Sequence, residues 1–285
     1  MTTKTGEPDD EQTERDQRLP LRCLAILPAR LGSTRLPRKM LLDESGLPLI
    51  VHSARNAARC TAFERVVVAT DSDEVQAACA VHDVECTLTR SDHPSGTDRV
   101  QEALEQIDKA GGPESFDVVV NVQGDEPDVE PDDLVQLCRA FVDLKVQVAT
   151  LCAPIETDEQ LRSPHVVKVV RDECGDALYF SRAAIPDGSH SRPEAPEPLE
   201  VARRHLGVYA FRPGALARYC ALAPSEYEQL ESLEQLRWIQ AGEKMRVLLA
   251  THVPLGIDTP ADYKAFVALE TATHNDRVTE TARKP

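Results

Sequence analysis

Short apolar runs alternate with amphipathic segments along the first half of the chain. The apolar runs predict strands at 22–28, 65–70, 84–88, 116–122 and 146–152. The segments between them predict helices at 48–59, 71–81, 95–107 and 131–143. Continuous apolar strands spaced by amphipathic helices are typical of a mostly parallel sheet with helices on both faces. The pattern therefore predicts a doubly wound α/β fold, which binds ligands at the carboxyl ends of its strands.

The second half departs from this alternation. Strands are expected at 166–170, 177–181 and 206–211 without helices between them, and 187–198 reads as a surface loop. A helix is expected at 226–240, a strand at 245–250, and a last helix to about residue 271, capped by Asp258-Thr259-Pro260. We expect a disordered acidic tail at 1–20, one domain at 21–272 and a polar tail at 273–285.

Composition narrows the class of protein. The chain has 285 residues and a net charge of -16, which argues against sequence-independent nucleic-acid binding and against docking on an anionic membrane. The first residues lack the apolar core of a signal peptide, and no apolar run approaches the length of about 18 residues that a membrane span needs. The eight cysteines form no C-x-x-C pair and read as buried thiols in a reducing compartment. We therefore expect a cytoplasmic protein without membrane insertion.

A cationic loop follows the first predicted strand. The apolar run 24–27 leads into a segment that carries Arg30, Arg35, Arg38 and Lys39. Backbone N–H groups and basic side chains at a strand end can converge on a polyanion. A solvated run of charge is the alternative, but the loop lies where this fold class places its ligands.

Two other segments could carry a cation or a polar ligand. Asp125 and Glu126 follow a Val-rich strand and could bind Mg²⁺, although a turn explains the same residues equally well. Asp258 could cap the last helix with one carboxylate oxygen and meet a metal with the other. Ser95 opens a predicted helix, whose free N–H groups suit an anion or a base edge.

The polar residues of the second half leave more than one interpretation open. Arg182 could pair with a carboxylate, whereas a lone histidine such as His205 is more often structural. Glu231 and Gln235 are four apart and are expected to share a helix face, which could simply be solvated. A dehydrogenase is disfavoured because no G-x-G-x-x-G follows the first strand.

Taken together, a series of short motifs resembles the 3-deoxy-manno-octulosonate cytidylyltransferases, and the likeness covers about residues 22–271. The motifs, in order, are Pro-Ala-Arg-x-x-Ser-Thr-Arg-Leu-Pro-x-Lys (28–39), Ala-Thr-Asp (69–71), Ser-Gly-Thr-Asp-Arg (95–99), Val-Gln-Gly-Asp-Glu-Pro (122–127), Tyr-Phe-Ser-Arg (179–182), Arg-His-Leu-Gly-Val-Tyr (204–209), Leu-Glu-Gln-Leu-Arg (233–237) and Ile-Asp-Thr-Pro (257–260).

The resemblance implies a nucleotide-diphospho-sugar transferase-like fold with a small added β region for sugar binding and dimerisation. It implies a homodimer that joins CTP and 3-deoxy-manno-octulosonate (Kdo) to CMP-Kdo with Mg²⁺, for lipopolysaccharide biosynthesis. The implied nucleotide-binding residues are Pro28, Ala29, Arg30, Arg35, Lys39, Ser95, Gly96 and Arg99. The implied catalytic residues are Arg30, Lys39, Asp125 and Asp258, of which the two aspartates would be the metal ligands. The implied sugar-binding residues are Gln123, Arg182, His205, Tyr209, Glu234 and Gln235.

The chain departs from the family pattern at a few positions. Arg38 and Met40 stand where the family usually has Gly and Pro around the lysine, and Pro94 stands where it often has Gln. Two alternatives remain: a cytidylyltransferase for another acidic sugar, such as 8-amino-Kdo or a sialic acid, and a catalytically weak nucleotide-binding paralogue. The intact set of Arg30, Lys39, Asp125 and Asp258 disfavours the paralogue.

Overall fold

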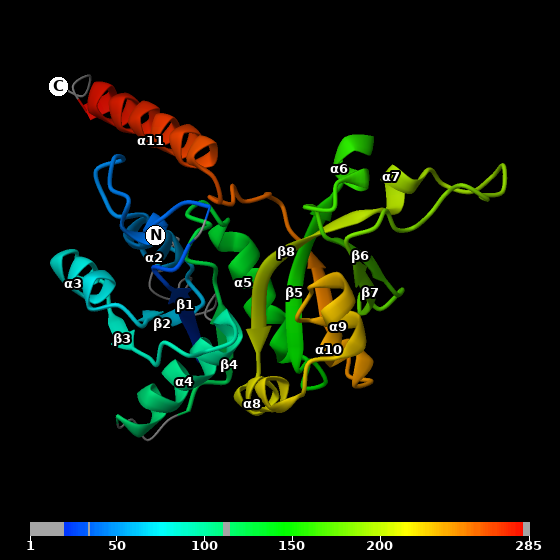
Figure 1. Cartoon of the computed structure of the whole chain (residues 1–285), viewed down its shortest axis with the longest axis horizontal. Coiled ribbons are helices and arrows are strands. Elements are labelled where there is room, and N and C mark those ends of the chain that lie inside the picture. The colour runs from blue at the N-terminus through cyan, green and yellow to red at the C-terminus, as the bar shows by residue number, and fades with distance from the viewer. Residues whose placement is uncertain (1–19, 34, 111–114, 282–285) are drawn as a thin grey trace, which may run out of the picture.

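A mixed sheet forms the centre of the computed structural model, which describes residues 20–33, 35–110 and 115–281, with side chains to residue 272. Among these residues, the main strand order is β3-β2-β1-β4-β8-β5-β9, and the hairpin β6-β7 joins through β8 (Figure 1). The strands are β1 (Cys23–Ala29), β2 (Phe63–Thr70), β3 (Cys86–Leu88), β4 (Val118–Asn121), β5 (Val148–Pro154), β6 (Lys168–Arg171), β7 (Ala177–Ser181), β8 (Arg203–Phe211) and β9 (Arg246–Leu249).

Four of the five strands predicted in the first half, β1 to β4, pair in parallel, as predicted. β1 lies between β2 and β4, and β2 pairs with β3, all in parallel. β8 then runs antiparallel to both β4 and β5, while β9 is parallel to β5. The antiparallel β8 therefore joins the parallel half to the strands of the second half.

Helices cover both faces of the sheet. They are α2 (Leu49–Ala57), α3 (Asp73–Val81), α4 (Gly96–Lys109), α5 (Pro131–Arg139), α6 (Asp158–Arg162), α7 (Pro198–Val201), α8 (Pro213–Ala221), α9 (Glu226–Glu231), α10 (Leu236–Gln240) and α11 (Pro260–Thr281), with 3₁₀ turns η1 (Lys39–Leu41) and η2 (Ala140–Val142).

Alternate residues of the strands enter two separate cores, as the period of two in a strand requires. On one face, Ala25 and Leu27 of β1 pack with α2, α3 and α5. On the other face, Leu24 and Ile26 pack with α4, α8 and α10. This two-sided burial explains why the strands of the first half read as continuous apolar runs, and it confirms the predicted fold class.

The second half differs from the predicted elements in several places. The expected helix at 226–240 is two helices, because Ser232 after α9 has φ 52°, a left-handed conformation that ends a helix. Three short helices, α6, α7 and α8, were not predicted. The last helix extends to Thr281 rather than to about 271, so residues 273–281 of the expected polar tail are helical.

The predicted tails and the predicted absence of a membrane span concern residues that the structure describes only in part. Residues 1–19 of the expected acidic tail and residues 282–285 lie outside the described residues. Within the described ranges, none of the helices combines the length and the hydropathy that a bilayer crossing would require.

Candidate active site

A cavity of about 300 Å³ lies where β1, β4 and the start of α4 meet, at the carboxyl ends of the two parallel strands. It contains every residue expected to bind the nucleotide, together with both expected metal ligands. Its lining residues are Pro28, Ala29, Arg30, Gly32, Ser33, Arg35, Lys39, Met40, His93, Ser95, Gly96, Arg99, Gln123, Asp125 and Asp258. Segments that are up to about 230 residues apart in the sequence therefore meet at the edge where this fold class binds ligands.

Lys39 lies between the two aspartates. Its buried ammonium Nζ donates to Asp125 Oδ2 at 2.5 Å and to Asp258 Oδ1 at 3.2 Å. It also donates to the backbone carbonyl of Ile257 at 3.1 Å. Arg35 reaches the other oxygen of Asp258, with Nη2 and Oδ2 3.1 Å apart. The ammonium group of Lys39 thus links the loop after β1, the loop after β4 and the segment before α11.

The two aspartates fit a magnesium ion that also binds substrate oxygens. Both carboxylates contact the same ammonium, so their oxygens already converge on one positive charge. The described residues contain no group of three or more acidic, histidine or cysteine side chains that could hold a metal. Mg²⁺ accepts one or two carboxylates when water and substrate phosphates complete its coordination. The donors are hard oxygens throughout, which suits this ion and not a soft metal.

The carboxylate of Asp258 does not cap α11, which differs from the sequence interpretation. Thr259 does so, because its Oγ1 accepts from the backbone N–H of Asp262 at 3.2 Å. The carboxylate of Asp262 in turn accepts from the backbone N–H groups of Asp258 and Thr259 at 3.1 and 2.8 Å. These bonds fix the backbone at Asp258 and leave its side chain to Lys39 and Arg35.

The other two arginines of the loop behave differently from each other. Arg30 is exposed at the cavity and has no hydrogen-bond or ion-pair partner among the described residues. Arg38 points to α3, where its guanidinium binds both carboxylate oxygens of Glu74 at 3.1 and 2.5 Å and lowers the pKa of that carboxyl. Arg38 has φ 57°, a conformation that favours glycine, which is the residue the family usually has there.

The start of α4 forms the other end of the cavity. Ser95 is the N-cap of α4, and its hydroxyl accepts from the backbone N–H of Asp98 at 3.2 Å. A Cβ on Gly96 would lie 3.4 Å from Pro28 Cγ, so the cavity wall is closely packed here. Ser95 and Gly96 thus bring the first turn of α4 to the cavity wall, and its role in nucleotide binding stays a prediction.

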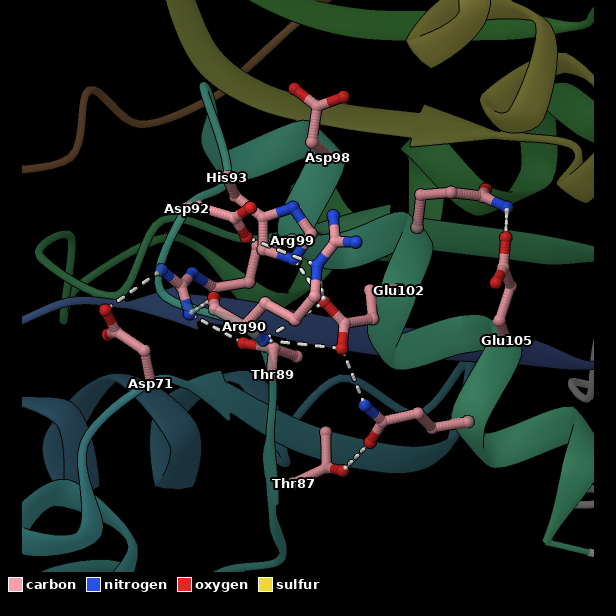
Figure 2. A network of polar contacts seen from close by, with 12 residues as sticks. Asp71, Thr87, Thr89, Arg90, Asp92, His93, Asp98, Arg99, Glu102 and Glu105 are labelled. Atoms are coloured by element: carbon pink, nitrogen blue, oxygen red, sulfur yellow. Dashed lines mark hydrogen bonds and ion pairs between the residues drawn. The ribbon is translucent and has the colours of Figure 1, made fainter.

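Arg99 lines the cavity, but its guanidinium is held by the protein. It donates to Thr89 Oγ1 at 2.6 Å and to the carbonyl of Arg90 at 3.3 Å, and it lies 3.5 Å from Asp71 Oδ2. Figure 2 shows these contacts around the segment that precedes α4. Arg99 therefore fixes the wall of the cavity through its neighbours.

Among the expected sugar-binding residues, only Gln123 lines this cavity. Its Nε2 donates to the carbonyl of Gly207 at 2.9 Å, which links the loop after β4 to β8. The structure places the rest of the set outside the cavity lining: Arg182, His205, Tyr209, Glu234 and Gln235.

Arg182 clamps the backbone around the break between α9 and α10. Its guanidinium donates to the carbonyls of Glu231, Pro164 and Ser232 at 2.7, 2.9 and 3.3 Å. The carboxylate of Glu231 accepts from Ser181 and from the backbone N–H of Arg182. The expectation that Glu231 and Gln235 share one helix face is therefore wrong, because Ser232 ends α9 between them.

The aromatic residues of β8 form an uncharged region. The rings of His205 and Tyr209 have centroids 5.3 Å apart, and His205 hydrogen-bonds Thr150 Oγ1 at 3.0 Å. Burial lowers the pKa of His205 to about 3, so its ring is neutral near pH 7. Burial also raises the pKa of Tyr209 and raises that of nearby Glu126 to about 8.

Glu234 links this region to the start of α4, at the wall of the cavity. Its carboxylate accepts from Ser95 Oγ at 3.2 Å and from Thr97 Oγ1 at 3.5 Å, and burial raises its pKa. Six buried polar side-chain atoms have no partner among the described residues, and three of them, Asn121 Oδ1, Glu126 Oε2 and Gln235 Nε2, belong to residues in or next to the motifs of the candidate site. Buried polar atoms are nearly always paired, so this group indicates a place for a polar ligand.

Some of these residues were not assigned a role from the sequence. Asn121 ends β4, and His93 lies two residues before the helix cap Ser95, whereas Glu126 had been considered together with Asp125 as a possible Mg²⁺ ligand. Gly32, Ser33 and Met40 are part of the cationic loop. Their position next to motif residues at strand ends could have indicated that they belong to the site. Their residue types alone did not point to a particular chemical role.

Comparison with known proteins shows the family to which the chain belongs. The model of the cytidylyltransferase family matches residues 24–245. A 3-deoxy-manno-octulosonate cytidylyltransferase of Xanthobacter autotrophicus is 46% identical over 258 residues, covering 88% of this chain and 96% of the relative. One from Rhodopseudomonas palustris is 44% identical over 244 residues, covering 84% and 94%. This chain belongs to the 3-deoxy-manno-octulosonate cytidylyltransferase family.

Solved structures extend the likeness to three dimensions. The CMP:2-keto-3-deoxy-manno-octonic acid synthetase complexed with CTP superposes with a TM-score of 0.79 at 37% identity, covering 88% of this chain and 99% of that one. A cytidylyltransferase from Leptospira borgpetersenii has a TM-score of 0.54 at 15% identity, covering 87% and 85%, and shows the fold alone. The family membership predicted from the motifs is confirmed, as is the α/β fold.

Proposed function

We propose that this protein transfers CMP from CTP to the anomeric hydroxyl of Kdo, giving CMP-Kdo and pyrophosphate. The observation that carries the proposal is the cavity in which Lys39 contacts both Asp125 and Asp258. Membership of the 3-deoxy-manno-octulosonate cytidylyltransferases and the likeness to a relative complexed with CTP support the choice of substrates.

The cationic end of the cavity suits a triphosphate. Arg30 is unpaired among the described residues and Arg35 is largely exposed, so both can bind phosphate oxygens without leaving a buried partner. Lys39 adds a third positive charge from the floor of the cavity. Transfer of a phosphoryl-type group depends on positioning and charge neutralisation rather than on a covalent nucleophile. We propose Arg30, Lys39, Asp125 and Asp258 as the catalytic residues.

Asp125 and Asp258 would hold Mg²⁺, with substrate oxygens as the remaining ligands. The ion would neutralise phosphate charge and lower the pKa of a bound hydroxyl. No histidine is needed as a base for this reaction, and His205 is neutral and bonded to Thr150. Pro28, Ala29, Ser95, Gly96 and Arg99 would form the base and ribose wall.

The region beside the cavity suits a polyhydroxylated sugar. We propose that Gln123, Arg182, His205, Tyr209, Glu234 and Gln235 surround Kdo. The unpaired buried atoms of Gln235, Asn121 and Glu126 are support for this, since sugar hydroxyls both donate and accept hydrogen bonds. Arg182 supplies positive charge for a carboxylate at the edge of this region.

The assembly and location of the protein are part of the same proposal. Leu178 of β7 and Leu230 of α9 are 58% and 82% exposed, which supports a homodimer that covers this region. All eight cysteines are free, which suits the reducing cytoplasm, where we place the enzyme in lipopolysaccharide biosynthesis.

A pyrophosphate-release assay tests the function. The protein is supplied with CTP and Mg²⁺ and with Kdo, 8-amino-Kdo or a sialic acid in turn. We expect release with Kdo at the highest kcat/KM. If another sugar were preferred, the protein would still be a cytidylyltransferase, but its proposed substrate would be wrong. No pyrophosphate release with any of the three sugars would contradict the proposed activity.

A further inference from the structure

His93 is a residue of the cavity to which no role has yet been given. It lies two residues before the N-cap of α4, its side chain is only 5% exposed, and it lines the cavity beside Ser95 and Gly96. A buried imidazole at the wall of a ligand cavity presents whichever ring nitrogen the protein leaves unpaired. The tautomer of this ring therefore decides what His93 offers to a ligand.

Glu102 of α4 sets that tautomer. Its carboxylate binds His93 Nε2, and it also accepts from the backbone N–H of Arg90 at 3.1 Å and from Gln106 Nε2 at 2.9 Å (Figure 2). Burial raises the pKa of Glu102, but these hydrogen bonds outweigh burial and lower it. An ionised carboxylate only accepts hydrogen bonds, so His93 Nε2 must carry the proton.

The other ring nitrogen, Nδ1, has no partner among the described residues. In the neutral ring with the proton on Nε2, Nδ1 carries a lone pair and can only accept. The carboxylate that binds Nε2 is itself held by the backbone N–H of Arg90 and by Gln106 Nε2, which fixes the side of the ring that faces Glu102. The cavity thus holds a fixed acceptor next to the first turn of α4.

We propose that His93 is a specificity-determining residue, whose Nδ1 accepts a hydrogen bond from the exocyclic amino group of the cytosine ring of CTP. Cytosine presents an amino donor at the position where uracil presents a carbonyl acceptor. The lone pair of Nδ1 therefore attracts the amino group of cytosine and repels the carbonyl oxygen of uracil. This inference rests on the proposed function, because it assigns the base of the nucleotide to the α4 end of the cavity.

The test compares two variants of nearly the same shape, His93→Asn and His93→Leu. The asparagine side chain keeps an acceptor near the position of Nδ1, whereas the leucine side chain offers none. For each protein, kcat/KM is measured with CTP and with UTP, at saturating Kdo and Mg²⁺. The affinities for CTP and UTP without Kdo are measured by calorimetry, and the melting temperature reports the fold.

The wild type is expected to prefer CTP. Loss of one hydrogen bond of ordinary strength should lower the CTP-to-UTP ratio about tenfold in His93→Leu, mainly through KM. His93→Asn should keep the ratio within about threefold of the wild type. If the Leu variant does not fold, the Asn variant decides: a retained ratio supports the acceptor role and a collapsed ratio contradicts it.

Other outcomes overturn the inference without touching the proposed function. A wild type that uses CTP and UTP equally, or a folded His93→Leu with an unchanged ratio, would remove His93 from base recognition while CMP transfer stands. Failure of the proposed function looks different, since the wild type would then release no pyrophosphate from CTP with any sugar.

Discussion

The cationic end of the candidate site and its sugar side are built from different kinds of contact. At the cationic end, Lys39, Asp125 and Asp258 hold one another through ion pairs, and Arg30 is free among the described residues. On the proposed sugar side, Arg182 is bound to backbone carbonyls, and His205 and Tyr209 are half-buried and neutral. We therefore propose that the first region neutralises phosphate charge and that the second holds the sugar by packing and hydrogen bonds.

Because of this difference, substitutions in the two regions should affect ligand binding and folding stability to different extents. The pair between Arg35 and Asp258 is partly exposed and contributes about 0–1 kcal/mol to folding, so it can be exchanged for a ligand at little cost, whereas the pair between Lys39 and Asp125 is largely buried. The bond from Arg182 to the carbonyl of Glu231 is partly buried, and its loss would leave that carbonyl unpaired at a cost of about 1–3 kcal/mol, whereas the bonds to Pro164 and Ser232 are exposed. Substitutions at the cationic end should therefore change rate, and substitutions on the sugar side should change stability as well.

The largest effect on rate is expected for Asp125→Asn. The variant keeps the shape of the side chain and an acceptor for Lys39 but removes the charge of one proposed metal ligand. We expect kcat to fall by about 10²–10³ or more, with little change in melting temperature. Asp132→Asn, in the exposed first turn of α5, is the matched control and should leave kcat unchanged. Near wild-type turnover of Asp125→Asn would remove Asp125 from the metal site.

An intermediate effect of a different kind is expected for Arg182→Met. It keeps the apolar stem and deletes the donors to Glu231, Pro164 and Ser232, so the free energy of unfolding should fall by about 1–3 kcal/mol. We also expect KM for Kdo to rise about tenfold while KM for CTP is unchanged. Denaturation and steady-state kinetics measure both. A loss of stability with both KM values unchanged would make Arg182 purely structural.

The smallest effect is expected for Arg38→Gly. Glycine relieves the left-handed backbone by about 1 kcal/mol. The ion pair with Glu74 that is lost is exposed to solvent, so its loss should matter little. Stability should stay within about 1 kcal/mol of the wild type and kcat within about threefold. Glu74→Gln removes the pair and keeps the strain, so it should be slightly less stable than Arg38→Gly. A collapse of kcat in Arg38→Gly would mean that the pair positions Lys39.

The same contrast explains what could be predicted from the sequence. The cationic end is formed by loops that follow β1 and β4, and parallel strands bring their carboxyl ends together whatever the details of packing. The pattern alone therefore placed the cationic loop with Arg30 and Lys39 at a ligand-binding strand end, whereas Asp125 was equally well explained by a turn until the family resemblance was considered. Asp258 was placed by the family resemblance, and its role as a helix cap was wrong because Thr259 competes for the same position.

The sugar side was less predictable for physical reasons. The helix breaks at Ser232, which has a left-handed backbone conformation. Serine is not typical of that conformation, so the sequence did not predict the break. Polar residues such as Asn121 and Glu126 read as turn residues in the sequence, and only burial shows that their atoms lack partners among the described residues. Contacts of Arg182 with distant carbonyls depend on tertiary packing, which no local pattern encodes.

The central claim is that the carboxylates around Lys39 serve a divalent ion in the transfer of CMP to Kdo. The direct measurement is the formation of CMP-Kdo and pyrophosphate from CTP and Kdo by metal-stripped protein, before and after Mg²⁺ is added. We predict no product in excess chelator and full turnover once Mg²⁺ is restored, with Asp258→Asn inactive in both conditions. Equal rates with and without chelator would contradict the account.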